Sequence, residues 1–274
     1  MSVTHVHDSD GIRKAMDPPE NALLLLDPGM YKGNLGFKNA RNVQWVAVDR
    51  ARPPVFCDCA WAAKFEGGQN ILLDGIHVQQ WTEYGFLFRP GPTPPWTDPV
   101  RGAHLRNCQV SGGTNGTAFK LAWVDGVVLD NCVVGGLLGN GITLNGCRGG
   151  LIRNCSVQTV GKVDGAMVIK TGSADIYVQG GTFRSEGPFG VWLGSDSSED
   201  VMRPEADGWQ AERIVIASAH VGCADTGFMF REARDCDLRD CTYSDRIKRE
   251  WSGSHSDGIR ALRPSSVRVT PAGG

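Results

Sequence analysis

One short segment recurs along this chain and constrains its fold more than any other feature. Each copy is a glycine followed by a run of alternating apolar and polar residues, as in NGITLNG, DGAMVIKTG and FGVWLGSD. The glycines of six copies lie 31, 25, 24, 25 and 37 residues apart: Gly85, Gly116, Gly141, Gly165, Gly190 and Gly227. A second segment with a polar corner residue, as in HLRNCQV and LIRNCSV, repeats with the same period. A fixed period of this length predicts a solenoid.

Each repeat has the pattern of a strand, a turn and a second strand. Period-two alternation, β-branched residues and corner glycines or asparagines favour short strands over helices. A single coil cannot bury its apolar side, but coils stacked about 4.8 Å apart bury a continuous core and pair their backbone groups. We therefore predict an all-β fold, a right-handed parallel β-helix that forms one domain over residues 1–274.

The N-terminal segment DSDGIRKAMDPP has the pattern of a short helix, with Ser9 or Asp10 near its N-cap. Such a helix would cover the first coil, whose open strand edge otherwise invites aggregation. We expect this cap to span about residues 1–20, the coils about residues 21–245, and an irregular tail residues 246–274.

Cysteine and asparagine recur at fixed places in the repeat. The chain has nine cysteines, several inside strand-like segments, which predicts reduced buried thiols and not a disulfide scaffold. We expect an interior ladder of Cys108, Cys132, Cys155 and Cys241. We expect a corner ladder of Asn107, Asn131 and Asn154 that satisfies buried turn amides.

The charge and hydropathy of the chain argue against nucleic acid and membranes as partners. The formal net charge is −2, so no whole-protein field favours nucleic acid. The apolar run ALLLL is far too short for a membrane span or a signal segment. We expect a monomer that binds neither nucleic acid nor membrane and is cytoplasmic, or secreted or periplasmic if a signal peptide has been removed.

Two long insertions mark one outer face of the predicted stack. Residues 89–102 and 194–209 both follow the last residue of the glycine-marked strand. Loops of this length in a compact stack are usually functional, and the interior of a β-helix is filled. The face between these insertions is therefore the candidate site.

The residues that follow the inward strand ends form an outward column on that face: Arg89, Ala122, Asn145, Lys170, Gly194 and Arg231. Lys170 and Arg231 should lie two coils apart, about 10 Å, with Gly194 leaving a notch between them. Cations interleaved with aromatic rings suit an acidic sugar. We predict these substrate-binding residues: Arg89, Lys120, Asn145, Trp192, Trp123, Trp96 and Asp196.

The segment DGAMVIKTGSADIYVQGGTF, together with GVWLGSD, resembles the pectate-lyase-like β-helix superfamily, nearest the chondroitinase B and alginate lyase group. The resemblance implies a lyase of uronate polysaccharides in which a strand-end lysine is the general base, and Lys170 is the matching residue. It also implies an arginine one coil later, a position where this chain has VWLG, so that Arg231 would substitute. The calcium ligands of the family match only Asp164 and Asn140, and we expect no metal cofactor.

Removal of a proton next to a carboxylate needs a neutralised carboxylate, a base and, for β-elimination, an acid for the leaving oxygen. Lys170 would be the base and Arg231 or Arg89 would stabilise the intermediate, whereas the acids considered, Tyr177, His77 and His220, fall on the second strand column. The same groove would equally serve an intracellular isomerase, cyclase or dehydratase of an anionic small molecule. A third alternative is a non-catalytic glycan-binding β-helix.

Overall fold

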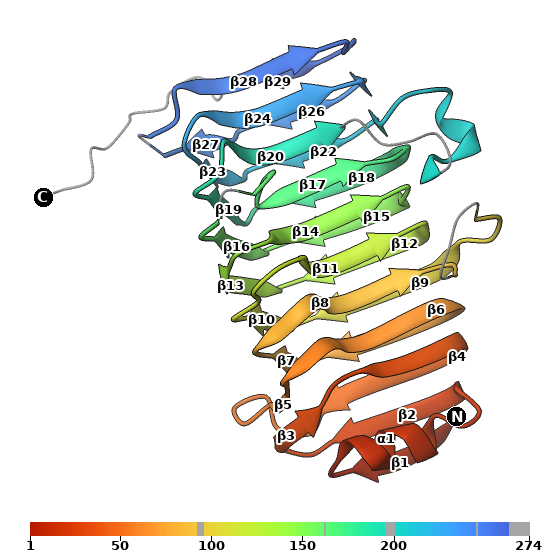
Figure 1. Ribbon diagram of the computed structural model, residues 1–274. Helices are drawn as coiled ribbons and strands as arrows, with labels where there is room; N and C mark the ends of the chain where they lie inside the picture. Colours follow the sequence, from red (N-terminus) through yellow and green to blue (C-terminus); the bar gives the residue numbers. More distant parts are fainter. Residues whose placement is uncertain (92–95, 162, 195–200, 245, 263–274) are drawn as a thin grey trace, which may run out of the picture.

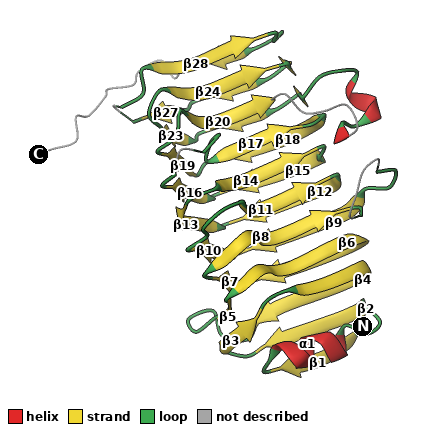
Figure 2. Ribbon diagram, viewed as in Figure 1, coloured by secondary structure: helices red, strands yellow, loops and turns green. Residues whose placement is uncertain are grey.

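The computed structural model describes residues 1–91, 96–161, 163–194, 201–244 and 246–262. The chain winds into a right-handed parallel β-helix of about 10 coils, which confirms the fold predicted from the repeat. Figure 1 shows the coils stacked one above another from β1 to β28, and Figure 2 shows how much of the stack is strand. The strands of successive coils pair in parallel, so each coil is held by the one below it.

A complete coil crosses three faces, which we call front, back and third. The front face holds β8 (Trp81–Arg89), β11 (Thr117–Ala122), β14 (Asn140–Asn145), β17 (Met167–Lys170), β20 (Phe189–Gly194), β24 (Thr226–Arg231) and β28 (Arg249–Ser254). The third face holds β3 (Gly29–Lys32), β5 (Pro54–Cys57), β7 (His77–Val78), β10 (Gln109–Ser111), β13 (Val133–Leu137), β16 (Ser156–Thr159), β19 (Thr182–Ser185), β23 (His220–Gly222) and β27 (Thr242–Tyr243).

The back face begins at the N-terminus. It holds β1 (Ser2–Val6), β2 (Glu20–Leu26), β9 (Val100–Arg106), β12 (Val124–Asp130), β15 (Arg148–Arg153), β18 (Ser173–Gln179), β21 (Ala211–Glu212), β22 (Val215–Ala217), β25 (Ala233–Arg234), β26 (Asp237–Arg239) and β29 (Arg260–Leu262). Two long strands, β4 (Leu35–Ala47) and β6 (Cys59–Asp74), run from the front face into the back face. The corner between these two faces is therefore a continuous strand in the first coils and a loop in the later ones.

The N-terminal cap differs in detail from the prediction. β1 pairs in parallel with β2, so a strand precedes the helix within the expected cap of residues 1–20. Helix α1 (Ser9–Ala15) has Asp8 as its N-cap, and not Ser9 or Asp10, because the Asp8 carboxylate accepts a hydrogen bond of 2.7 Å from the Gly11 amide. Ile12 is fully buried under the helix. No helix in the described ranges is long and apolar enough to cross a membrane.

The interior is filled by stacked side chains. Phe65 and Phe88 stack at 5.0 Å between ring centroids, and Phe86 and Phe119 at 5.8 Å, in successive coils. All nine cysteines are free thiols, and all but Cys57 are buried. The thiols of the predicted ladder bond to carbonyls of the coil below, as Cys132 does to the Leu105 oxygen at 3.4 Å. The cysteines are thus core residues, as the repeat predicts.

The corner asparagines make different hydrogen bonds from those predicted. The Asn131 amide donates to the Asn107 side chain at 2.8 Å, and Asn107 donates to the Asp74 carboxylate at 2.8 Å. Asn131 and Asn154 are exposed, and the three asparagines have φ near +53°, in the left-handed region. Asparagine is favoured here because it tolerates that conformation and bonds its neighbour, so it does not serve buried turn amides.

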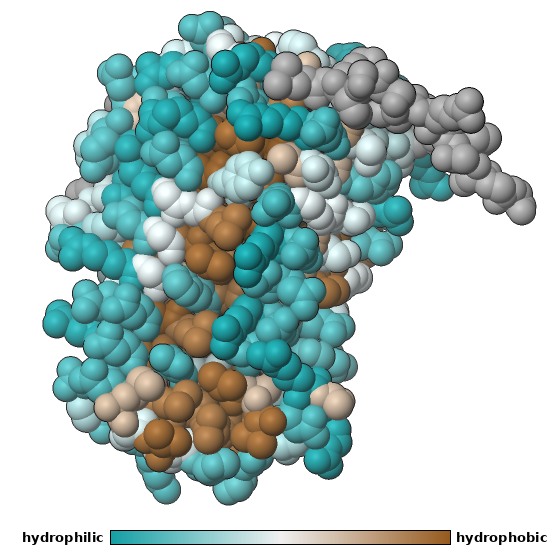
Figure 3. Space-filling model, turned by 180° about the vertical axis from the view of Figure 1, so that it is seen from behind, coloured by the Kyte–Doolittle hydropathy of each residue, from teal (hydrophilic) through white to brown (hydrophobic). Residues whose placement is uncertain are grey.

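The back face carries an apolar band, seen along the stack in Figure 3. One register column of this face contains Leu23, Leu72, Val128, Leu151, Tyr177 and Val215, with Gln44 and His104 at the positions between the first three. Arginines beside it are held by carboxylates, as Arg106 is by Asp74 at 2.9 Å and Arg153 by Asp130 at 2.7 Å. Arg106 and Arg153 therefore already have carboxylate partners.

Candidate functional site

The strand register of the front face places the predicted column where the sequence alignment put it. Phe88, Leu121, Leu144 and Ile169 lie in register and are buried. The next outward column is Glu66, Arg89, Ala122, Asn145, Lys170, Gly194 and Arg231. A second outward column lies two residues earlier in each of these strands. Its members are Lys64, Leu87, Lys120, Thr143, Val168, Trp192 and Met229. We call the surface formed by these two columns the front groove.

The floor of the front groove is made of small or apolar residues. Leu87, Ala122 and Val168 point outward, yet each is at most 5% exposed. An outward residue is buried only when neighbouring side chains lie over it, so the longer side chains of the two columns enclose this surface. Charges on the groove are therefore partly removed from water.

Lys120 and Lys170 lie two coils apart on the groove, in the second and the first outward column, and we call them the lysine pair. Both side chains are partly buried, and neither ammonium group makes an ion pair or hydrogen bond with a described residue. Burial, and then the positive charge of Lys170, lower the pKa of Lys120 to about 8, against smaller opposing effects of Cys147 and Asp164. Lys120 is thus partly neutral near pH 8, a property that its place in the sequence does not reveal.

Arg89 belongs to a partly buried ion-pair cluster. Its guanidinium donates to Glu66 Oε1 from Nη2 at 2.5 Å and from Nε at 3.1 Å, and Lys64 Nζ lies 3.6 Å from the same oxygen. Lys64 also lies over the Trp61 ring at 4.5 Å. The charge of Arg89 is therefore offset by Glu66. Sequence reasoning missed Glu66 and Lys64 because this coil has Ala62 where the other coils have the marking glycine, although aligning Phe65 with Phe88 would have found them.

Arg231 is partly buried and lies in the coil beyond Gly194, as predicted. The expected notch at Gly194 is absent at this described position. A Cβ on Gly194, where φ is +90°, would lie 1.6 Å from the Arg231 carbonyl oxygen. Glycine is thus required by the close approach of the next coil's backbone, and that backbone fills the space.

The four tryptophan and aspartate positions predicted to bind substrate have different surroundings. Trp192 is partly buried on the groove and packs edge-on against Phe189 at 5.2 Å. Trp123 is 3% exposed, so it presents no ring face to the groove. Trp96 lies at the corner beside Trp123, 5.9 Å between centroids. Asp196 lies outside the described residues.

Trp123 instead holds the second insertion. Its indole nitrogen donates to the Val201 carbonyl at 2.9 Å, and the Arg203 guanidinium lies 4.6 Å from its ring centroid. Arg203 is 4% exposed, pairs with Asp125 at 2.5 Å and donates to the Gly146 carbonyl at 2.7 Å. The described part of this insertion, with its 3-10 helix at Pro204–Ala206, is thereby fixed against the corner between the front and back faces.

The amide and carboxylate candidates lie at opposite ends of the front strands. The Asn145 side-chain oxygen, next to Lys170, is buried and accepts no hydrogen bond from a described residue. Asn140 accepts a bond of 3.4 Å from the Gly165 amide, and Asp164 is exposed. The described residues contain no cluster of three or more His, Cys, Asp or Glu side chains arranged to hold a metal. The expectation of no metal cofactor stays a prediction, with Asn140 and Asp164 as the weak calcium candidates.

The three acids considered from the sequence lie on other faces. Tyr177 is on the back face, in β18, while His77 and His220 are on the third face, in β7 and β23. Burial lowers the pKa of both histidines. These side chains therefore do not reach the front groove.

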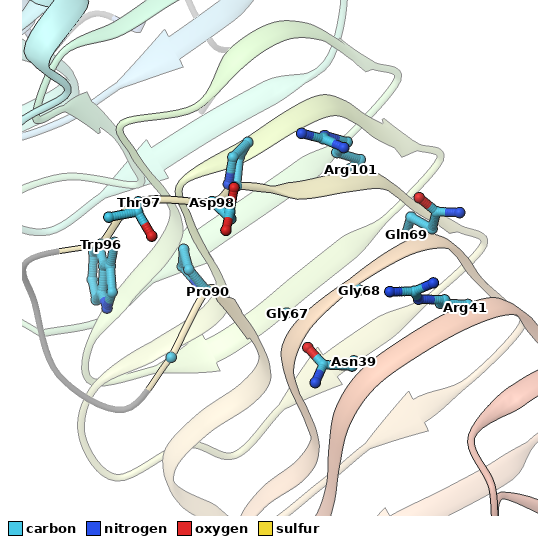
Figure 4. Close-up of a pocket in the computed structure, with 12 residues that line it drawn as sticks. Asn39, Arg41, Gly67, Gly68, Gln69, Pro90, Trp96, Thr97, Asp98 and Arg101 are labelled. Carbon is cyan, nitrogen blue, oxygen red and sulfur yellow. The ribbon is translucent and has the colours of Figure 1, made fainter.

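A polar cavity of about 450 Å³ lies at the corner between the front and back faces, beneath the first insertion. Figure 4 shows Arg41, Gln69 and Arg101 side by side on neighbouring strands, with Thr97 and Asp98 opposite them. The remaining lining residues are Asn39, Gly67, Gly68, Pro90, Gly91, Trp96 and Pro99. We call this the corner pocket. The sequence predicted only Trp96 of this set, because the pocket joins three coils that are distant along the chain.

No protein-family model matches the chain, and no curated protein matches it. Among solved structures, it is similar to the A-module of the Azotobacter vinelandii mannuronan C-5 epimerase AlgE6, with a TM-score of 0.58 and 13% identity over 92% of this chain and 84% of that one. It is also similar to the A-module of the mannuronan C-5 epimerase AlgE4 from the same organism. The TM-score is 0.57, and the identity is 12% over 96% of this chain and 92% of that one. For the PL6 family alginate lyase AlyGC the TM-score is 0.44, with 12% identity over 94% of this chain and 39% of that one.

At these identities the likeness to the epimerase modules is a likeness of fold. It covers almost the whole chain, so the stack is one β-helix from its first coil to its last described one. The predicted resemblance is confirmed at that level: the protein has the right-handed parallel β-helix fold that these carbohydrate-active proteins share.

Proposed function

We propose that this protein is an enzyme of acidic, uronate-containing polysaccharides that removes the proton next to the sugar carboxylate in the front groove. The lysine pair carries this proposal, because it places a lysine with a pKa of about 8 beside a second, cationic lysine. Mannuronan epimerases with the same fold act on such a polymer, which supports the substrate class.

In this proposal the two lysines have different roles, one as the base and one as the partner of the carboxylate. Lys120, neutral in part near pH 8, takes the proton, while the Lys170 ammonium pairs with the carboxylate and stabilises the negative charge that develops on it. This assignment exchanges the roles that the family resemblance implies, where Lys170 is the base. In β-elimination the bond from the neighbouring carbon to the glycosidic oxygen then breaks, and that oxygen takes a proton.

Epimerisation is a second candidate, since it begins with the same proton removal and returns a proton to the opposite side of the same carbon. Tyr177, His77 and His220 lie on other faces and cannot supply the proton that either reaction returns, so this proton would come from water. The similarity of the stack to two mannuronan C-5 epimerase modules favours epimerisation. The two reactions differ in product: elimination leaves an unsaturated sugar, and epimerisation leaves an intact chain.

The test is incubation with a panel of uronate polymers in deuterated water. Deuterium in the recovered sugar, measured by NMR, reports proton removal, and ultraviolet absorbance of the unsaturated product reports elimination. We expect kcat/KM to rise about tenfold per pH unit below pH 8 and to level off above it, because the base must be deprotonated.

Variants assign the roles. Lys120→Met should abolish exchange while polymer binding is retained, and Lys170→Met should mainly weaken binding. Lys14→Met, an exposed lysine on α1, is the matched control. Exchange that persists in Lys120→Met with an unshifted pH profile would show that another group is the base. Polymer binding with neither deuterium exchange nor unsaturated product in the native protein would favour a glycan-binding β-helix instead.

A further inference from the structure

The corner pocket presents two arginines in a line. Arg41 in β4, Gln69 in β6 and Arg101 in β9 are register neighbours in three successive coils. At the strand spacing of about 4.8 Å, the two arginine backbones are about 10 Å apart with Gln69 between them. Figure 4 shows the three side chains lying side by side on one wall of the pocket.

Both guanidinium groups are open to a ligand. Neither Arg41 nor Arg101 makes an ion pair or a side-chain hydrogen bond with a described residue, and both are exposed. On the same face Arg106 and Arg153 are held by carboxylates, so these two differ from their neighbours. The arginine fork matches a carboxylate in two-point contact, which makes the pair a candidate for binding acidic groups.

The other lining residues suit a sugar better than a simple anion. Asn39 and Gln69 provide amides, and Asp98 provides a carboxylate that accepts hydrogen bonds from hydroxyl groups. Asp98 would repel a phosphate, which carries more negative charge than a carboxylate. Trp96 adds an aromatic ring, and a cavity of about 450 Å³ is of the size that ligand sites have.

We propose that the corner pocket is a second saccharide site, which holds a carboxylate-bearing sugar unit through Arg41 and Arg101. This rests on the proposed function, because the unit belongs to the same polymer that reaches the lysine pair. The coil of Arg101 lies next to the coil of Lys120, since β8 and β9 pair with β11 and β12. A chain that crosses the front groove past Arg89 towards the corner therefore reaches the pocket, which Pro90 lines, and binding strengthens with chain length.

The test measures binding of oligouronates of increasing length by titration calorimetry, in a Lys120→Met background that prevents turnover. We expect affinity to rise with length, and the double variant Arg41→Gln/Arg101→Gln to lose about tenfold for the longest oligomers and much less for the shortest. Arg184→Gln, an exposed arginine in β19 on the third face, is the matched control. A neutral glucan of equal length should not bind.

An unchanged length dependence in the double variant would overturn the pocket proposal. Inorganic phosphate that competes with the longest oligouronate as well as a free uronate does would overturn the carboxylate assignment. Binding that depends on Arg41 and Arg101, with neither deuterium exchange nor unsaturated product from the native protein on the same polymer, supports the pocket and overturns the proposed reaction.

Discussion

The pKa of Lys120 is lowered by its surroundings on the outer surface of the solenoid. Its neighbours across the strands are Leu87 and Thr143, both at most 5% exposed, so its ammonium lies over a surface from which water is largely removed. Lys170 adds a like charge nearby. Both effects disfavour the protonated form, and a protonated Lys120 therefore destabilises the folded protein.

Replacing Lys120 by Met should stabilise the protein at neutral pH. The pKa of Lys120 is lowered from 10.5 to about 8 on folding, so the unfolded chain binds more protons between these values and stability rises with pH across that window. The gain from Lys120→Met is therefore greatest below pH 8, at most about 3 kcal/mol, and shrinks towards pH 10.5. Thermal unfolding of both proteins at pH 7 and pH 10 measures it, and a gap that does not change with pH would contradict the shifted pKa.

At the scale of elements, the described parts of the two insertions contact the coils. The described part of the second is fixed by Arg203, which contacts Asp125, Gly146 and Trp123 at once. The corner pocket lies beneath the first, next to Trp96 and Trp123. The shape of the site thus depends on contacts between insertions and coils, in addition to the strands.

Arg203→Ala should loosen the second insertion without unfolding the stack. It removes a charged hydrogen bond to Asp125, a second to the Gly146 carbonyl and a cation–π contact with Trp123, so we expect a local loss of about 2–4 kcal/mol. Faster amide hydrogen exchange and proteolysis near residues 201–209 would show it. Arg203→Lys, which keeps the charge but not the planar fork, should recover only part of the protection. Equal protection in all three proteins would mean that Arg203 does not fix the insertion.

The whole molecule is a one-dimensional stack, in which each strand pairs only with the coils on either side of it, while the second insertion reaches further through Arg203. Such stacks need covered ends, because an open strand edge pairs with another chain. β1 and α1 cover the first coil, and Ile12 is the fully buried contact of the helix.

Ile12→Asp should uncover the N-terminal end. An unpaired carboxylate at this fully buried position detaches α1, so we expect a lower unfolding temperature and concentration-dependent association. Light scattering and size-exclusion chromatography measure this. Lys14→Asp, at an exposed position of the same helix, makes a larger charge change and should remain monomeric. Association in both variants would point to charge, and not the cap, as the cause.

Much of the front groove could be predicted from the sequence, because the coil length is nearly constant there. Aligning Leu121, Leu144 and Ile169 is enough to place Lys170 beside Asn145, as the strand register does. The prediction was weaker where the repeat signal is irregular. Glu66 and Lys64 lie in a coil without the marking glycine, and β1 precedes all the glycine-marked copies of the repeat.

The sequence by itself determined the parallel β-helix, its interior cysteines and the face on which Lys120 and Lys170 lie, because a period of two within strands and of one coil between them fixes which residues share a side. Only the tertiary structure decided the pKa of Lys120, the pairing of Arg89 with Glu66, the burial of Trp123 and the corner pocket. These depend on desolvation and on contacts outside the repeat, such as that of Arg203 with Asp125, 78 residues apart in the chain. A local sequence pattern does not show which long side chain will bury which neighbouring residue.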